Sequence, residues 1–227
     1  MKSYVINLAR RPDRLSAVTK RFDEVSVDLT PFVAVDARDF PPPGEMDLVP
    51  SGIFACWQSH NMLLSEIADG PDETVLIFED DAVPNFTVDW PLLVERLPSS
   101  MEAHRLGFLQ LGFVSWQYRF TRPGALERLR SLLYSRSRRT IELDKSRVVI
   151  YGSALSGTHS YAVTREFARR IPAINTPCWT GADGLYMRLS SMSGADGIFP
   201  GMARLTRSLV EQESRTQRST TLDSDVS

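Results

Sequence analysis

The sequence predicts a layered α/β domain, and three observations lead to this prediction. A short apolar segment at residues 4–8 is followed by a basic run and then by apolar residues at helical spacing. A second apolar segment, 32–35, comes next, so the order is strand, loop, helix, strand. The third observation is the apolar run 74–78, which ends in three consecutive carboxylates. Ligands of such domains bind beyond the carboxyl ends of parallel strands, so polar residues at those ends are the first candidates for a site.

The same apolar periodicity predicts the remaining elements. Helices are expected around residues 15–22, 53–68, 92–97, 165–171 and 185–192, with Asp13 as the cap of the first and Asp89 ahead of the third. Further strands or apolar segments are expected at residues 106–112, 148–151 and 156–163. The prolines within residues 38–51 exclude a helix there and indicate an ordered surface loop or flap.

Composition limits the classes of function. A chain of 227 residues with 42% hydrophobic content can bury one substantial core, so we expect one domain. The net charge of −2 gives no general attraction to nucleic acid. The two cysteines, Cys56 and Cys178, are far apart and lack CxxC spacing, so we expect reduced, buried thiols rather than a disulfide framework or a structural zinc site. No apolar run is long enough for a spanning helix, so a soluble, cytoplasmic protein is expected.

The carboxylates that follow the run 74–78 are Glu79, Asp80 and Asp81. Neighbouring like charges repel and raise one another's pKa unless a cation or strong donors neutralise them. Oxygen ligands of this kind suit hard ions such as Mg²⁺ or Mn²⁺, which complete their shells with substrate phosphates. The alternative is that these acids only cap the next element. The pattern favours a divalent metal at the end of a strand.

A basic insertion follows near residues 116–147. It carries nine Lys and Arg residues between positions 119 and 147 against three acidic ones. A solvated basic segment explains it, and so does a clamp for an acidic acceptor or peripheral contact with anionic lipid at the inner face of a membrane. The sequence leaves these alternatives open.

Several common catalytic motifs are absent from the sequence. It contains no GxxxxGK[ST] motif for a P-loop, no GxGxxG after the first strand, and neither GxSxG nor HExxH. P-loop ATPases, dinucleotide oxidoreductases, serine hydrolases and zincins therefore lose support. A strand-end acid cluster that shares a crevice with arginines suits a metal-bound diphosphate.

Five sequence blocks in order resemble glycosyltransferase family 25, the lipopolysaccharide-type and collagen-type galactosyltransferases. They are Val5-Ile6-Asn7-Leu8-x-Arg10-Arg11-x-Asp13-Arg14, Cys56-x-x-Ser59-His60, Phe78-Glu79-Asp80-Asp81-Ala82, Gly157 to Val163, and Leu209 to Gln212 with Ser224-Asp225-Val226. The resemblance implies a GT-A type fold with a central, mostly parallel sheet flanked by helices. We expect one such domain at residues 1–215, and the Ser/Thr-rich, polar sequence beyond it predicts a tail at 216–227. Ala55 departs from the family's usual Gly, and the basic insertion is longer than expected.

The resemblance also implies roles for residues. Glu79 and Asp81 would hold the metal, Asp81 most directly, and Asp80 would touch ribose or metal-bound water. The nucleotide would be lined by Asn7, Arg10, Arg11, Arg14, Asp36, Ser59, His60 and Gln212. Inverting transfer also needs a general base near the acceptor hydroxyl, and Asp183, in a Gly-containing loop that opens a helix, is the candidate for it. Several of these residues could instead have a purely structural role. The alternatives are a surface ion pair for Arg14, a turn for Asp36, a structural group for His60, a helix cap for Asp183 and an exposed helical position for Gln212.

The function that the resemblance implies is metal-dependent, inverting transfer of a sugar to a hydroxyl of a glycan, lipopolysaccharide or protein acceptor. The donor it implies is UDP-galactose, and the cofactor is Mn²⁺ or Mg²⁺. Two other classes remain open: a silent nucleotide-sugar-binding protein, and a metal-dependent phosphotransfer or phosphohydrolase enzyme.

Overall fold

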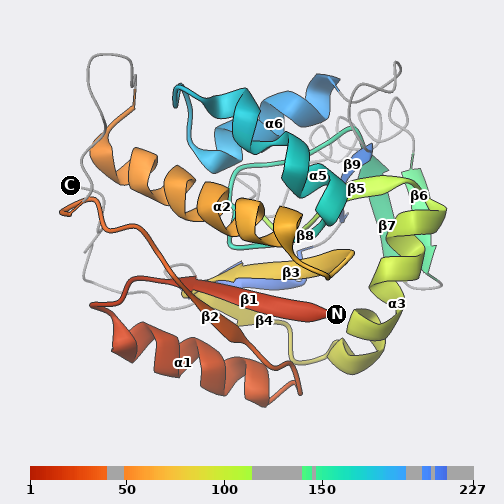
Figure 1. Cartoon of the computed structure of the whole chain (residues 1–227). Helices are drawn as coiled ribbons and strands as arrows, with labels where there is room; N and C mark the ends of the chain where they lie inside the picture. The colour runs from red at the N-terminus through yellow and green to blue at the C-terminus, as the bar shows by residue number, and fades with distance from the viewer. Residues whose placement is uncertain (40–48, 114–139, 145–146, 193–200, 206–207, 214–227) are drawn as a thin grey trace, which may run out of the picture.

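A computed structural model describes residues 1–39, 49–113, 140–144, 147–192, 201–205 and 208–213 (Figure 1). The helices are α1 (Pro12–Asp23), α2 (Ser51–Asp69), α3 (Trp90–Ala103), α5 (Arg165–Arg170) and α6 (Ala182–Met192), with a 3₁₀ turn at Pro172–Asn175. The strands are β1 (Lys2–Asn7), β2 (Thr30–Val33), β3 (Thr74–Glu79), β4 (Ala82–Pro84), β5 (Leu106–Gly112), β6 (Thr140–Asp144), β7 (Arg147–Tyr151), β8 (Ser160–Thr164), β9 (Gly201–Leu205) and β10 (Val210–Gln212). The α/β class is confirmed.

The strands form one mixed sheet in the order β2-β1-β3-β8-β5-β9-β7-β6, and β10 joins it by pairing with β4 and β5. β1 is parallel to both β2 and β3. β8, however, lies antiparallel between β3 and β5. The expectation of a mostly parallel sheet is therefore corrected. An apolar run indicates that a strand is buried but not in which direction the strand runs. The sequence pattern could therefore not predict that β8 is antiparallel to its neighbours.

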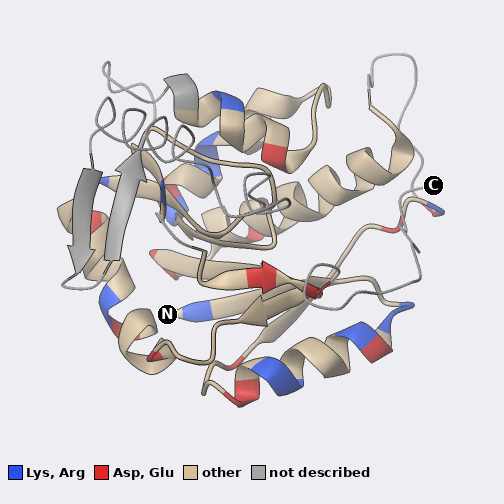
Figure 2. Cartoon of the chain, turned by 180° about the vertical axis from the view of Figure 1, so that it is seen from behind, with Lys and Arg blue, Asp and Glu red and all other residues tan. Residues whose placement is uncertain are grey.

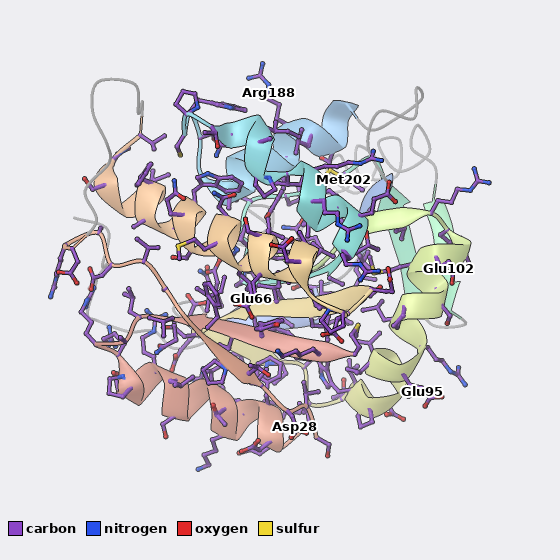
Figure 3. The ribbon with its side chains drawn as sticks, in the orientation of Figure 1. Asp28, Glu66, Glu95, Glu102, Arg188 and Met202 are labelled. Carbon is purple, nitrogen blue, oxygen red and sulfur yellow. The ribbon has the colours of Figure 1, made fainter. Side chains whose placement is uncertain are left out.

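Helices cover both faces of the sheet, as Figure 1 shows. On one face α2, α5 and α6 enclose an apolar cluster that includes Trp57, Tyr161 and Phe167. On the other face α1 and α3 enclose a second cluster, in which the rings of Phe22 and Phe78 have centroids 4.4 Å apart. Figure 3 shows Arg188 of α6 and Glu102 of α3 pointing outward. The core is thus split into two layers by a sheet that is buried on both sides.

The starts of α3 and α1 show how the local sequence begins a helix. Asp89 caps α3, since its side chain accepts a hydrogen bond from Leu92 N at 3.0 Å. The expected cap of α1 is wrong: Asp13 lies inside the first turn, and the N-cap position is held by Arg11 without a side-chain cap bond. Pro12 at the first helical position explains why α1 begins there, because its fixed φ suits that position and its missing N–H is not needed.

Part of the sequence prediction falls outside the described residues. Residues 40–48 of the proline-rich loop, most of the basic insertion and the tail 216–227 are among these, so the predicted membrane contact stays a prediction. Within the described ranges, no helix combines the length and the apolar character needed to cross a membrane.

Candidate functional site

The carboxyl ends of β1, β2 and β3 meet at one edge of the sheet, because these strands are parallel. Asn7 is the last residue of β1, and its neighbour Ile6 pairs in register with Glu79 at the end of β3. Figure 2 shows acidic positions at the tip of β3. The side-chain amide of Asn7 donates to Leu8 O at 2.8 Å, while its buried Oδ1 has no hydrogen-bond partner among the described residues. The predicted strand-end site is therefore assembled in space.

Asp81 is held at this edge from two sides. The pairing of β10 with β4 sets Gln212 opposite Ala82, and the Gln212 amide donates to Asp81 Oδ2 at 3.0 Å. From α1, Arg14 Nη2 lies 2.7 Å from Asp80 Oδ1 and 3.6 Å from Asp81 Oδ2. The other Asp81 oxygen, Oδ1, is buried and makes no hydrogen bond within the described part of the chain. Gln212 therefore lies in a strand at the site, and the alternative of an exposed helical position is wrong.

The surroundings of Asp81 favour a positive ion. Burial is the largest influence and raises the pKa of Asp81 to about 7, and the negative charges of Glu79 and Asp80 act in the same direction. Arg14 and the Gln212 hydrogen bond oppose this rise without cancelling it. A carboxylate that is desolvated, crowded by like charges and left with an open oxygen is an expected ligand for a cation.

The raised pKa predicts a pH-dependent stability gain for Asp81→Asn. The folded state binds the Asp81 proton more tightly than the unfolded chain, so this group's contribution to stability is complete below about pH 4 and is lost as pH rises through about 7. Asn does not titrate. In chelator, chemical denaturation at pH 8 should therefore find Asp81→Asn more stable than the parent by roughly 1–3 kcal/mol, with the advantage shrinking as pH falls.

The exposed Asp28, labelled in Figure 3, provides the matched control. Asp28→Asn should leave the pH dependence of the unfolding free energy unchanged. If the difference in unfolding free energy between Asp81→Asn and the parent stays constant between pH 4.5 and pH 8, the pKa of Asp81 is not raised in the folded protein.

Glu79 is charged and held by hydrogen bonds. Its carboxylate accepts from Thr158 Oγ1, and His60 Nε2 lies 3.3 Å from Glu79 Oε1. Burial acts most strongly and would raise the pKa of Glu79, but the contacts with His60 and Thr158 together outweigh it and lower that pKa. His60 in turn contacts the hydroxyl of Tyr161 at 2.7 Å through Nδ1. His60 thus links the acid cluster to the core between α2 and the sheet.

A single loop orients both Glu79 and Asp183. Thr158 donates to Glu79, and two residues earlier Ser156 Oγ donates to Asp183 Oδ2 at 2.8 Å. Between them Gly157 has a φ of 101°, a conformation that suits glycine. Asp183 lies inside the first turn of α6, where its Oδ1 accepts from Gly184 N at 2.7 Å, rather than at the cap position.

The loop that contains Gly157 is held in place by Gln110, a buried residue of β5. Its side-chain amide donates to Leu155 O at 2.8 Å and to Gly157 O at 2.6 Å, and its Oε1 accepts from Leu155 N at 2.8 Å. The only clue to this role in the sequence is that a polar residue, Gln110, stands at a position expected to be buried, inside an otherwise apolar run.

We expect Gln110→Leu to destabilise the protein by about 1–3 kcal/mol, because backbone groups of Leu155 and Gly157 lose their partners inside the fold. Turnover should fall as well, since the loop positions Glu79 and Asp183. Urea denaturation and initial rates measure the two effects. If stability falls while turnover per folded molecule is unchanged, the loop does not position the site.

The other predicted residues have clear places. Arg10 Nε lies 2.6 Å from Asp36 Oδ2, which joins the ends of β1 and β2. The Asp36 side chain also accepts a hydrogen bond from Arg38 N at 3.0 Å, so Asp36 does form a turn. This bond and the contact with Arg10 lower the pKa of Asp36. Arg11 contacts Asp13 on the surface. Contacts of these residues with a nucleotide stay a prediction.

Ser59 has a structural use in this conformation. Its hydroxyl donates to Ala55 O at 2.8 Å and accepts from Val35 N at 2.9 Å. It therefore ties α2 to the segment that follows β2. Whether it also contacts a donor stays a prediction.

Cys56 differs from its expected environment. Cys178 is buried as predicted, whereas Cys56 is exposed, and neither forms a disulfide. Although the Cys56 side chain reaches solvent, the surrounding protein desolvates its thiol, and this desolvation together with the charges of Glu79, Asp183 and Asp81 raises the pKa of that thiol. The charges of all three carboxylates act on this thiol. The hydrogen bonds from Ser156 to Asp183 and from Thr158 to Glu79 connect Asp183 to the strand-end acids through one loop.

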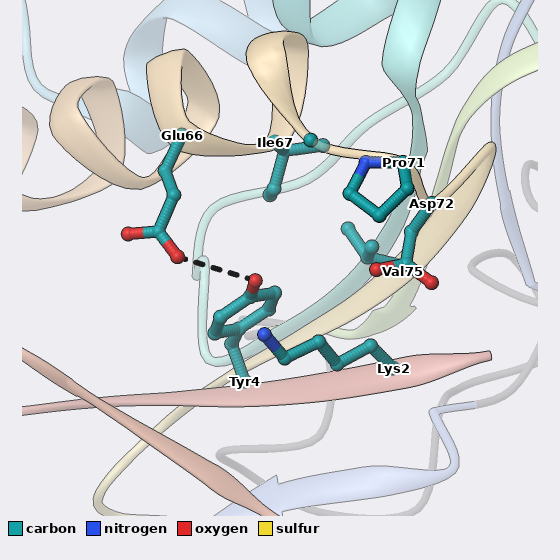
Figure 4. Close-up of a pocket in the computed structure, with 8 residues that line it drawn as sticks. Lys2, Tyr4, Glu66, Ile67, Pro71, Asp72 and Val75 are labelled. Atoms are coloured by element: carbon teal, nitrogen blue, oxygen red, sulfur yellow. Dashed lines mark hydrogen bonds between the residues drawn. The ribbon is translucent and has the colours of Figure 1, made fainter.

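A separate hollow of about 160 Å³ lies at the opposite ends of β1 and β3 (Figure 4). There the Tyr4 hydroxyl donates to Glu66 Oε1 at 3.3 Å, and Lys2 Nζ lies 4.5 Å from the Tyr4 ring centroid. Its polar groups already contact one another, and it lies away from the strand-end carboxylates. It is not the candidate site.

Comparisons with known proteins agree on a family. The model of a family described as "Glycosyltransferase family 25 (LPS biosynthesis protein)" matches residues 1–185. A protein of Aedes aegypti, described as "Glycosyltransferase 25 family member", is 32% identical over 94 residues, which cover 34% of this chain and 16% of that protein. This chain thus spans only a small part of that relative's length.

Among solved structures, residues 1–349 of Staphylococcus aureus TarS match with a TM-score of 0.44 and 9% identity, covering 94% of this chain and 61% of that chain. A similarity this weak supports no conclusion about fold or function.

Proposed function

Since this chain belongs to glycosyltransferase family 25, we propose that it transfers a sugar from a nucleotide diphosphate to an acceptor hydroxyl, with a divalent cation at the strand-end carboxylates. The observation that carries this proposal is the state of Asp81. Its Oδ1 is buried without a hydrogen-bond partner in the described residues, while its pKa is raised to about 7. A cation at this position would relieve both conditions.

The residues at the edge fit a hard ion. Asp81 Oδ1 is the ligand we propose, with Glu79 close enough for its charge to raise the pKa of Asp81. Oxygen ligands of this kind suit Mn²⁺ or Mg²⁺. When bound, the ion would neutralise the charge that develops on the departing diphosphate. Gln212 keeps the Asp81 carboxylate oriented through its bond to Oδ2.

The nucleotide would lie across the ends of β1 and β2. Guanidinium groups match phosphate oxygens in geometry and charge. Arg14 already faces the acid cluster through Asp80, and Arg10 is held by Asp36. The open Oδ1 of Asn7 is an acceptor suited to a ribose hydroxyl or a base N–H. UDP-galactose is the donor we propose.

Asp183 is the base that we propose. Inverting transfer needs a carboxylate that takes the proton of the acceptor hydroxyl while its oxygen attacks the anomeric carbon and the bond to the diphosphate breaks. Ser156 and Gly184 hold the Asp183 carboxylate by hydrogen bonds, which fix its direction. Its charge acts on the Cys56 thiol together with those of Glu79 and Asp81, which supports a shared site.

Release of UDP from UDP-galactose tests this proposal. With Mn²⁺ the rate should rise when a glycan acceptor is added, and chelator should abolish it. A silent binding protein would show saturable binding without turnover. A phosphohydrolase would cleave phosphate esters at a rate that does not depend on any sugar acceptor. Either of these results would replace the function proposed above.

A further inference from the structure

Three side chains with different ligand atoms meet beside the Asp81 contacts. Cys56 and His60 are four residues apart on α2, which places them on the same face of that helix. Glu79 approaches them from the end of β3. The thiol sulfur, an imidazole nitrogen and a carboxylate oxygen of this trio all lie within 4.8 Å of one another.

The spacing suits a small tetrahedral ion. Nitrogen and oxygen ligands about 2.0–2.1 Å from such an ion lie about 3.3–3.4 Å apart. His60 Nε2 lies 3.3 Å from Glu79 Oε1. A metal–sulfur bond is longer, about 2.3 Å, and the Cys56 sulfur lies within 4.8 Å of both the imidazole nitrogen and the carboxylate oxygen. The trio therefore already brings together three ligand atoms of the types that hold such an ion.

The groups behind the trio are those that ligands of a metal require. A ligating histidine usually has its second ring nitrogen in a hydrogen bond, which fixes the tautomer and the ring orientation. His60 Nδ1 lies 2.7 Å from the Tyr161 hydroxyl, so Nε2 is the nitrogen that faces Glu79. Thr158 holds the Glu79 carboxylate in the same way. The supporting residues, Tyr161 and Thr158, are buried, and both contacts are already in place.

The chemical environment favours a cation over a reactive thiol. Cys56 is exposed, which leaves a path by which an ion can enter from solvent. The nearby carboxylates Glu79, Asp81 and Asp183 add negative charge around the sulfur. Negative charge of this kind disfavours a free thiolate but stabilises a thiolate that is bound to a divalent ion.

We propose that Cys56, His60 and Glu79 form a binding site for a thiophilic divalent cation of the Zn²⁺ type, with a fourth position open to solvent. Thiolate and imidazole ligands select Zn²⁺ over Mn²⁺ or Mg²⁺, whereas the oxygen ligands of Asp81 select the hard ions. The site therefore differs from the Asp81 position proposed for the sugar donor in the ion that it selects, although its ligand Glu79 belongs to the same group of strand-end carboxylates. It goes beyond the glycosyl transfer proposed above, because it needs neither donor nor acceptor.

The test uses the full chain, freed of metal, titrated first with Co²⁺ alone and then with Zn²⁺. One equivalent of Co²⁺ should produce a thiolate-to-cobalt charge-transfer band in the near ultraviolet, and Zn²⁺ should remove it. Cys56→Ser should abolish the band and weaken Zn²⁺ binding at least about 100-fold. Cys178→Ser should keep both, since this buried cysteine has no part in the trio. Circular dichroism confirms that both variants fold.

Any of four results would overturn the proposal. The parent protein could show no charge-transfer band, Cys56→Ser could keep the band or bind Zn²⁺ as tightly as the parent, or Cys178→Ser could lose the band. Binding of Zn²⁺ that is equally tight in Cys56→Ser would place the ion at other ligands, such as Asp80 and Asp81. None of these readouts involves UDP or a sugar, so failure here leaves the glycosyltransferase proposal standing, and failure of that proposal leaves this one testable.

Discussion

Asp81→Asn is expected to lower metal-dependent turnover of the sugar donor by about 10²–10⁴-fold, because the departing diphosphate loses the ion that neutralises its charge. The fold should persist, since the change removes a charge that burial and neighbouring acids already disfavour. Initial rates of UDP release at saturating Mn²⁺, together with circular dichroism, measure the two quantities.

In Asp81→Asn, stability and activity should change in opposite directions. Asp81→Asn should be more stable than the parent at pH 8 and far less active, a combination typical of a residue kept for function at a cost to folding. Asp28→Asn, which removes an exposed carboxylate, should match the parent in both measurements. If Asp81→Asn has the donor affinity and the turnover rate of the parent, Asp81 is not part of the site.

Asp183→Asn carries the second large effect. It should bind donor normally but transfer about 10²–10⁴-fold more slowly, since amide oxygen is a poor base. The amide oxygen can still accept from Gly184 N, so the first turn of α6 should keep its shape. The maximal transfer rate should fall while the dissociation constant of UDP in Mn²⁺ stays within about twofold.

Ser156→Ala provides the companion variant, because it removes the hydrogen bond to Asp183 Oδ2 but leaves the carboxylate. A smaller loss of transfer is expected there, with donor binding again unchanged. If Asp183→Asn transfers at a near-normal rate, the base is another residue. If both variants lose donor affinity instead, Asp183 belongs to the donor contacts.

The arrangement of the strand-end site could be predicted because it depends on local sequence. The strand at residues 106–112 has the predicted bounds, and the run 74–78 ends in carboxylates as expected. Once strands β1, β2 and β3 are parallel, their carboxyl ends must share an edge. That is why Asn7, Asp36 and Glu79 could be grouped without a structure.

What could not be predicted depends on contacts between distant segments. The antiparallel insertion of β8, the grip of Gln110 on the loop at Gly157, and the exposure of Cys56 all arise between residues far apart in sequence. Apolar periodicity indicates that one face of a segment is buried, but it does not indicate which other segment packs on that face. The short strands β4 and β9 gave no separate signal for the same reason.

Calorimetric titration of UDP into the metal-free chain, with and without Mn²⁺, tests the central claim most directly. The account predicts saturable UDP binding in Mn²⁺ that chelator removes and that Asp81→Asn weakens at least about tenfold, a loss of about 1.4 kcal/mol. Equal UDP affinity with and without Mn²⁺, or an Asp81→Asn variant that binds like the parent, would contradict a cation held at the end of β3.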